Sequence, residues 1–122
     1  MKQAQKISDA EMEVMRAIWK AGEPVTSGQV QEALADKGWK TTTVCTFLAR
    51  LTAKGLLKTE KAGRGYRYAP QMTEKEYREL ETREFLKEVH GGSLKSFFAV
   101  LSGGEELTAD DIQELKDWLK DQ

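Results

Sequence analysis

The chain has 122 residues, of which 39% are hydrophobic and 32% are charged. This composition excludes a disordered polypeptide, and the length is that of one domain. The longest uninterrupted apolar run, Phe97–Leu101, is far shorter than the roughly 20 residues of a membrane span, and the N-terminus lacks the apolar segment of a signal peptide. We therefore expect a cytoplasmic protein without membrane insertion. One cysteine (Cys45) and one histidine (His90) build neither an internal disulfide nor a standard zinc site, so no metal or other cofactor is expected.

The net charge of −1 hides a division between the two parts of the chain. Residues 1–70 contain 12 basic and 7 acidic residues, whereas residues 71–122 contain 7 basic and 13 acidic residues. Within 37–67 there are eight basic residues and one acid, a local charge of +7. Such a stretch is typical of a nucleic-acid binder, although a solvated charged surface without a partner would look the same.

Capping boxes, in which Ser or Thr is followed three residues later by Glu or Gln, mark three helix starts. They are Ser8 with Glu11, Thr26 with Gln29, and Thr73 with Glu76. The first two predict helices that end near Gly22 and at Gly38. The third opens a long helix to about Val89.

A further helix is predicted from about Thr41 to Gly55, where the glycine occupies the C′ position. Leu56 would then fall at C″, in contact with Leu51 as in a Schellman motif. Along this helix the spacing i, i+3, i+4 and i+7 gathers four side chains into one apolar stripe, which we expect to face the core. They are Val44, Phe47, Leu48 and Leu51.

Two strands are predicted after this helix, over residues 56–61 and 66–68, joined by a turn at residues 62–65 in which glycines flank Arg64. A short strand at residues 24–26 would complete the sheet. Three helices followed by a two-stranded hairpin predict a winged helix-turn-helix, so the fold class is mainly α with a small antiparallel β wing. We expect a DNA-binding domain over residues 1–71 and a helical dimerisation region over residues 72–122.

The last fifty residues are predicted to form three helices, of which the last is capped by Thr108. Three short helices cannot bury their apolar side chains in a core of their own, so they pack either on the first seventy residues or on a second copy of the chain. The charge division favours the second copy, and hence a homodimer. The residues expected in the dimer contact are Tyr77, Leu80, Leu86, Leu94, Phe97, Phe98, Leu101, Ile112, Leu115, Trp118 and Leu119.

The outer face of the helix from Thr41 to Gly55 carries threonines and alanines instead of the lysines and glutamates that usually solvate a helix. In a helix-turn-helix this helix enters the major groove, and a threonine can hydrogen-bond a base edge or pack its methyl on that of thymine. We therefore expect base contacts near its N-terminus and phosphate contacts from the basic residues that flank it and lie in the wing. The expected DNA-binding residues are Lys40, Thr41, Thr42, Thr43, Thr46, Arg50, Lys54, Arg64 and Arg67.

Plainer interpretations of the same residues stay open. Thr41 could merely cap its helix, and Arg50 could pair with a carboxylate. Cys45, at the edge of the apolar stripe, is expected to be a partly buried small hydrophobe. No catalytic constellation can be assembled, so an enzyme is not expected. The alternative to a sequence-specific repressor is a winged-helix module that docks on proteins.

Four segments in this order resemble the penicillinase-repressor family of winged-helix regulators (BlaI, MecI and CopY). They are ISDAEMEVMRAIW, TTTVCTFLARLTAKGLL, GRGYRYAP and FLKEVHGGSLKSFF. The resemblance covers nearly the whole chain. It implies a homodimeric repressor of β-lactamase-type resistance genes that binds inverted repeats with TACA/TGTA cores. It also implies that Thr42, Thr43 and Thr46 read bases, and that release involves a membrane sensor protease.

The chain departs from the family pattern in three places. The copper-responsive branch ends in Cys-x-Cys ligands, whereas no cysteine follows Cys45 here. Staphylococcal members are cut at an Asn-Phe bond, and the matching position here is Val100-Leu101. Those members also carry basic residues where Thr42 and Cys45 stand, so the operator preference is expected to differ in detail.

Overall fold

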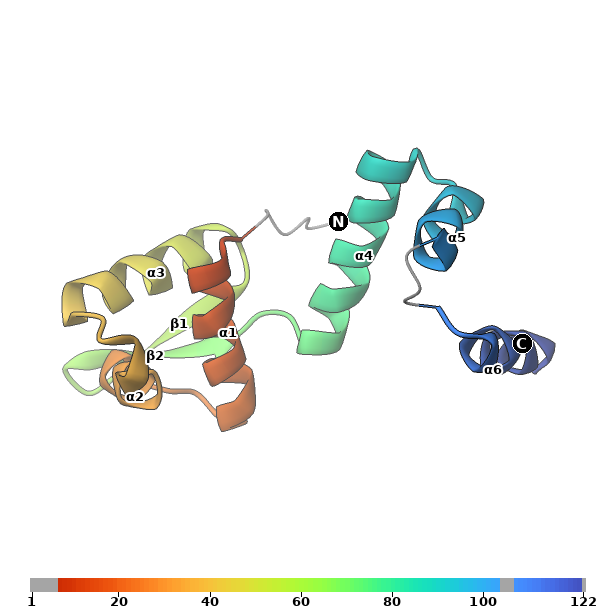
Figure 1. The fold of residues 1–122 in the computed structure, drawn as a ribbon. Coiled ribbons are helices and arrows are strands. Elements are labelled where there is room, and N and C mark those ends of the chain that lie inside the picture. Colours follow the sequence, from red (N-terminus) through yellow and green to blue (C-terminus); the bar gives the residue numbers. More distant parts are fainter. Residues whose placement is uncertain (1–6, 104–106, 122) are drawn as a thin grey trace. The chain divides into compact units, whose positions relative to one another are not determined.

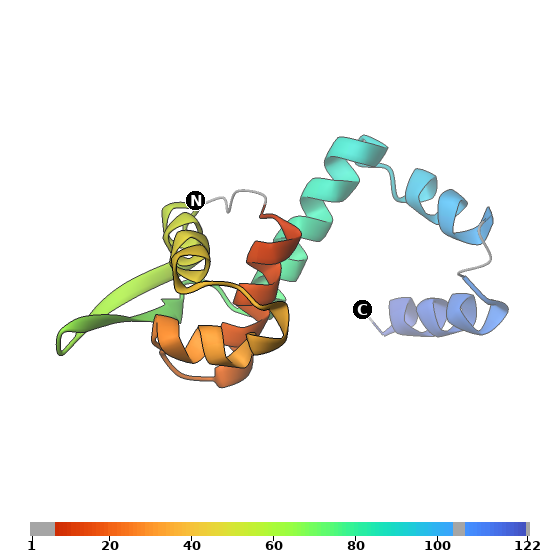
Figure 2. The same cartoon turned by 60° about the vertical axis from the view of Figure 1, so that its left-hand side comes forward.

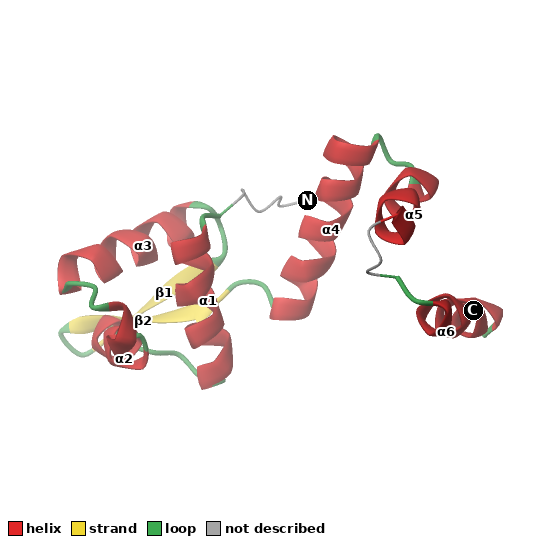
Figure 3. Ribbon diagram, viewed as in Figure 1, coloured by secondary structure: helices red, strands yellow, loops and turns green. Residues whose placement is uncertain are grey.

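The computed structural model describes residues 7–103 and 107–121, which form helices and one hairpin (Figures 1 and 3). The chain divides into two compact units, with the boundary after Glu81. Within the described residues, no helix is long and apolar enough to cross a membrane.

The first two helices begin at the predicted capping boxes. Helix α1 (Asp9–Ala21) is capped by Ser8, whose hydroxyl accepts from the Glu11 backbone N–H while the Glu11 carboxylate accepts from Ser8 N–H. Helix α2 (Ser27–Ala33) is capped in the same way by Thr26. It ends earlier than predicted, because the chain tightens into the 3₁₀ helix η1 (Ala35–Lys37) before Gly38 turns it with φ +68°.

Helix α3 (Thr41–Ala53) ends in the predicted Schellman motif. The Leu56 N–H donates to the Leu51 carbonyl at 3.0 Å and the Gly55 N–H donates to the Thr52 carbonyl at 3.1 Å. Gly55 has φ +86°, which an L-residue with a side chain rarely adopts. The motif turns the chain directly into the hairpin while Leu51 and Leu56 both stay buried.

The wing is an antiparallel pair, β1 (Leu57–Ala62) and β2 (Gly65–Pro70), in which Thr59 lies opposite Tyr68 and Lys61 opposite Tyr66. The predicted third strand is a single bridge, in which Val25 and Tyr68 exchange backbone hydrogen bonds of 3.0 and 2.7 Å. Figure 2 shows the hairpin reaching outward beyond α3.

The core of the first unit is apolar and draws on α1, α2, α3, the start of β1 and the loops between them. It is made of Val14, Met15 and Ile18 of α1, Val30 of α2, Val44, Leu48 and Leu51 of α3, and Val25, Leu34, Leu56, Leu57 and Tyr77. Three of the four residues of the predicted α3 stripe are buried and the fourth, Phe47, packs against the cluster. The stripe therefore fixes which face of α3 is turned inward and which is left outside.

The long helix α4 (Glu74–His90) begins in the first unit. Tyr77 is 5% exposed, its ring lies 6.0 Å from that of Trp19, and burial raises the pKa of its hydroxyl to about 12. The indole of Trp19 also donates to the Met72 carbonyl at 2.9 Å. Tyr77 was expected in a dimer contact, but this packing inside the first unit leaves it unavailable to a second copy.

The second unit holds the end of α4, α5 (Leu94–Gly103) and α6 (Ala109–Lys120), and Thr108 caps α6 as predicted. His90 ends α4, with its Nδ1 2.9 Å from Ser96 Oγ and its ring beside those of Phe85 and Phe97. No described side chain of residues 82–121 is buried to the degree of the first unit's core. The described part of this unit therefore has contacts between side chains but no closed core.

Candidate nucleic-acid interface

The outward face of α3 is smooth and polar. Thr42, Thr46 and Ala49 are exposed on it, and Thr43 is half-buried at its flank. These side chains lie opposite the buried stripe because residues four apart share a helix face. The face can approach another surface closely, since it carries no long side chain at its centre.

Two of the predicted DNA-binding threonines of α3 already donate a hydroxyl hydrogen bond within the protein. The Thr41 hydroxyl donates to Gln31 Oε1 at 3.0 Å, and the Thr46 hydroxyl donates to the Thr42 carbonyl at 2.8 Å. Both hydroxyls keep their acceptor lone pairs. Thr41 does not cap α3, because the N-cap is Lys40 and no side chain caps this helix.

Two of the predicted cations beside this face are available for a ligand. Lys40 and Arg50 are exposed, and no carboxylate among the described residues lies within ion-pair distance of either. Arg50 therefore does not pair with a carboxylate of the described residues, contrary to that alternative.

Lys54 was expected at a phosphate, and the structure gives it a partner within the fold. Its Nζ lies 2.7 Å from Glu11 Oε1, and the Glu11 side chain is almost fully buried. Burial alone would raise the pKa of Glu11, but the hydrogen bonds from Lys54 and Ser8 outweigh it and lower that pKa. The ammonium therefore neutralises an internal carboxylate and ties the end of α3 to α1.

The two predicted cations of the wing, Arg64 and Arg67, lie in different places. Arg64 is exposed in the turn, whereas Arg67 lies opposite Glu60, on the other side of the sheet from Tyr66 and Tyr68, because side chains alternate along a strand. Burial raises the pKa of Tyr68, and the neighbouring Cys45 and Tyr66 raise it further. Tyr68 itself packs against the apolar core of the first unit.

Lys61 and Tyr66 are a pair that the sequence did not single out as a site. They lie directly opposite each other on the tyrosine face, and Tyr66 is 56% exposed. Strand alternation places Tyr66 on one face with Tyr68, but it does not show that only Tyr68 is covered by the core.

Cys45 was expected to be partly buried, and this expectation is wrong. The thiol side chain is exposed on α3, between the core stripe and the outer face. The buried sector of α3 is narrower than expected and does not extend to this flank.

The residues expected in a dimer contact leave an apolar surface on the second unit. Leu94, Ile112, Trp118 and Leu119 are exposed. The others in that set, apart from Tyr77, are half-buried, namely Leu80, Leu86, Phe97, Phe98, Leu101 and Leu115. Val100 and Leu101, at the expected cleavage position, lie within α5, where Val100 is 64% exposed.

Comparison with known proteins places this arrangement in a family. The family model described as "Penicillinase repressor" matches residues 7–121. This chain belongs to the penicillinase repressor family. It is 36% identical over 115 residues to the penicillinase repressor of Bacillus licheniformis, covering 94% of this chain and 90% of that protein. It is 28% identical over 114 residues to the methicillin resistance regulatory protein MecI of Staphylococcus aureus (strain N315), covering 93% of each chain.

A solved structure agrees with the fold of the first unit. The solution structure of the monomeric form of Bacillus licheniformis BlaI in complex with the blaP half-operator matches with a TM-score of 0.53 and 40% identity. The match covers 63% of this chain and 94% of that one. The chain is therefore a winged-helix, DNA-binding transcriptional repressor of a family that regulates antibiotic resistance, which confirms the predicted fold class and family.

Proposed function

We propose that this protein is a homodimeric repressor that binds an inverted-repeat operator of the TACA/TGTA kind, one half-site per first unit. Helix α3 enters the major groove, where Thr42 and Thr43 contact base edges through their hydroxyls and Thr46 offers its methyl and acceptor lone pairs. Lys40 and Arg50 hold the phosphates beside the groove, and Arg64 and Arg67 contact the backbone from the wing. Lys61 and Tyr66 join the residues that contact the DNA. Thr41 and Lys54 act indirectly, because they hold α3 in place through Gln31 and Glu11.

The observation that carries the proposal is the outer face of α3. It combines exposed short hydroxyl side chains with flanking cations that have no ion-pair partner among the described residues, which suits a groove lined by phosphates. A protein-docking module needs no such charge, so the response to salt separates the two functions.

The test measures operator affinity as a function of salt. With about seven phosphates neutralised per dimer, the slope of log K against log salt is expected near −6. Arg50→Ala is expected to reduce this slope by about two per dimer, whereas Arg83→Ala, the same change on α4, leaves it unchanged. Binding that ignores salt, or an Arg50→Ala variant that binds like the wild type, would reject the proposal.

The dimer follows from the weakness of single threonine contacts. None of them matches a bidentate arginine–guanine pair, so useful specificity requires two half-sites held at a fixed spacing. The exposed apolar side chains of α5 and α6 supply the surface for a second copy. Footprinting on an inverted repeat and on its isolated half is expected to show much tighter binding to the repeat.

We also propose that release occurs by proteolysis in α5, carried out by a membrane sensor protease. This short helix follows Gly91 and Gly92, both at positive φ, and none of its side chains is fully buried. A protease needs extended backbone, so the helix must open locally, and helices without buried contacts open most readily. Limited proteolysis is expected to cut first between residues 91 and 107, and a first cut in the wing would count against this release mechanism.

A further inference from the structure

The start of α3 is held in an unusual way. Helices α1, α2 and α6 each have a capping box, whereas α3 has no side-chain hydrogen bond at its N-cap, Lys40. The residues that would read DNA lie in the first turn of this uncapped helix. Something other than a local cap must therefore fix their position.

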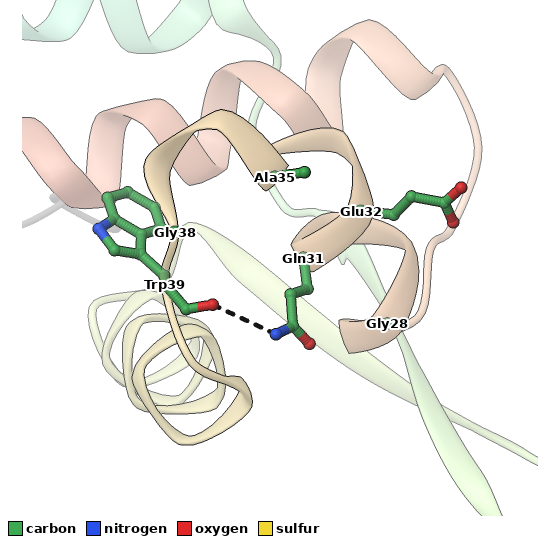
Figure 4. A pocket seen from close by; sticks show the side chains of 6 residues that line it. All are labelled: Gly28, Gln31, Glu32, Ala35, Gly38 and Trp39. Carbon is green, nitrogen blue, oxygen red and sulfur yellow. Dashed lines mark hydrogen bonds between the residues drawn. The ribbon is translucent and has the colours of Figure 1, made fainter.

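Gln31 of α2 provides that connection. Its Nε2 donates to the Trp39 carbonyl at 3.2 Å and its Oε1 accepts from the Thr41 hydroxyl at 3.0 Å. The amide thus bridges the chain on both sides of Lys40. Figure 4 shows the Gln31 side chain reaching across to Trp39 at the edge of an open pocket that is lined by α2, Ala35 of η1 and the turn at Gly38 and Trp39.

The chemistry of the partners fixes the orientation of this amide. A flipped amide would set its oxygen against the Trp39 carbonyl, and two acceptors cannot share a hydrogen bond. Trp39 is itself held by its edge contact with Phe47, whose ring centroid lies 5.1 Å away. Within the described residues, these two bonds are the side-chain hydrogen bonds that join α2 to the start of α3.

We infer that Gln31 is a positioning residue for operator recognition, which sets the depth and rotation of the first turn of α3 in the groove. It acts through Thr41 and the Trp39 carbonyl and does not itself touch DNA. The core packing of α2 on α3 is apolar and does not need it, whereas base contacts fail when a side chain is displaced by a fraction of an ångström. This inference rests on the proposed function and adds to it a residue outside α3 that controls specificity.

The test uses the full chain and a duplex that the wild-type protein selects from a randomised pool. Discrimination is the ratio of affinities for the selected duplex and for a scrambled one. Gln31→Met keeps the length and helix preference of the side chain but removes both hydrogen bonds. We expect discrimination to fall roughly three- to tenfold, as for the loss of one or two hydrogen bonds, with the salt slope and the midpoint of urea unfolding close to those of the wild type.

A second variant and a control make the outcome specific. Thr41→Val keeps the shape and removes the donor, so it is expected to lower discrimination by a smaller factor, and the double variant is expected to be no worse than Gln31→Met alone. Gln71→Met, the same change at an exposed glutamine, is expected to behave like the wild type.

Two results would overturn the inference while leaving the proposed function standing. One is unchanged discrimination in Gln31→Met, whether both affinities stay the same or fall by the same factor, and the other is full additivity of Gln31→Met with Thr41→Val. A wild-type protein that selects no sequence from the pool would instead remove the proposed function, and this inference with it.

Discussion

Glu11 shows how one buried carboxylate can stabilise the fold or destabilise it, depending on its partner. Its Oε1 is held by Lys54, whereas its Oε2 is buried with no hydrogen-bond partner among the described residues. The Lys54 side chain is 23% exposed, against 3% for Glu11. Loss of the lysine therefore strands a buried charge, whereas loss of the carboxylate leaves an ammonium that can turn to water.

This asymmetry gives a prediction for stability. Lys54→Met is expected to lower the free energy of unfolding by about 3 kcal/mol, the usual cost of breaking a buried pair. Glu11→Gln is expected to cost only about 1 kcal/mol, because glutamine still completes the capping box at Ser8. Urea unfolding of both variants measures the two values, and equal losses would contradict the account.

The same carboxylate predicts a dependence on pH. Its pKa lies below the ordinary value of 4.5 in the folded chain, so the unfolded chain binds the proton first as the pH falls. The stability that Glu11 supplies is therefore complete above about pH 5 and is lost as the pH drops below the ordinary pKa. The difference in unfolding free energy between wild type and Glu11→Gln is expected to be constant above about pH 5 and to narrow as the pH falls below the ordinary pKa of 4.5. Glu76 and Asp111, whose pKa values are also lowered, are common to both proteins and cancel.

Thr46 offers a test of how a threonine reads a base. Because its hydroxyl proton is bound to the Thr42 carbonyl, the methyl is the group best placed to contribute in the groove. Thr46→Val keeps the methyl and is expected to change operator affinity by less than about twofold, whereas Thr46→Ser is expected to lose about threefold or more. Competition titrations with one labelled operator give both numbers, and the reverse order would assign the contact to the oxygen.

At the level of elements, local sequence signals predicted where helices begin and end but not what holds one against another. The capping boxes at Ser8 and Thr26 and the Schellman end at Gly55 are patterns within a few residues, and the structure has all three. The contact of Lys54 with Glu11 spans 43 residues of sequence. The periodicity of α1 and α3 does not predict this ion pair.

In the candidate site too, the features set by local spacing could be predicted, whereas those set by contacts between elements could not. Helical spacing was enough to place Thr42 and Thr46 on the outer face of α3, because the apolar stripe opposite them is strong. It could not show that Cys45 is uncovered, because that depends on how far neighbouring elements extend around the helix. Nor could it reveal the bridge from Gln31 to Thr41, which exists only once η1 and Gly38 have turned the chain back.

Gly55 links α3 to the wing, and its backbone conformation predicts the effect of a substitution on stability. At φ +86° an alanine is strained, so Gly55→Ala is expected to destabilise the fold by about 1 kcal/mol. Gly28→Ala is the matched control, because Gly28 is helical and an added Cβ would meet only Thr26 Oγ1, at 3.9 Å. That change is expected to be neutral or to stabilise by up to about 1 kcal/mol. Urea midpoints that moved equally for both variants would show that φ is not the cause.

At the level of the whole molecule, the two units differ in how they are stabilised. The first has a closed apolar core to which α1, α2, α3 and Tyr77 of α4 contribute. The described part of the second has aromatic contacts among Phe85, His90, Phe97 and Phe98 but no fully buried side chain, and α6 leaves Trp118 and Leu119 more than half exposed. In the proposed dimer, a second copy of the chain covers the apolar side chains that this unit leaves exposed, which stabilises its folded form.

Association through the second unit predicts that its folding and its dimerisation are one event. Leu115→Lys, on the apolar face of α6, is expected to give a monomer by sedimentation, to lose helical circular dichroism, and to bind an isolated half-site as well as the wild type does. It should lose the gain in affinity on an inverted repeat, because the two heads are no longer linked. Glu114→Lys introduces the same residue one position away, outside the apolar face, and is expected to stay dimeric. A Leu115→Lys protein that remained a dimer, or that lost half-site binding as well, would show that the heads and the second unit are not organised in this way.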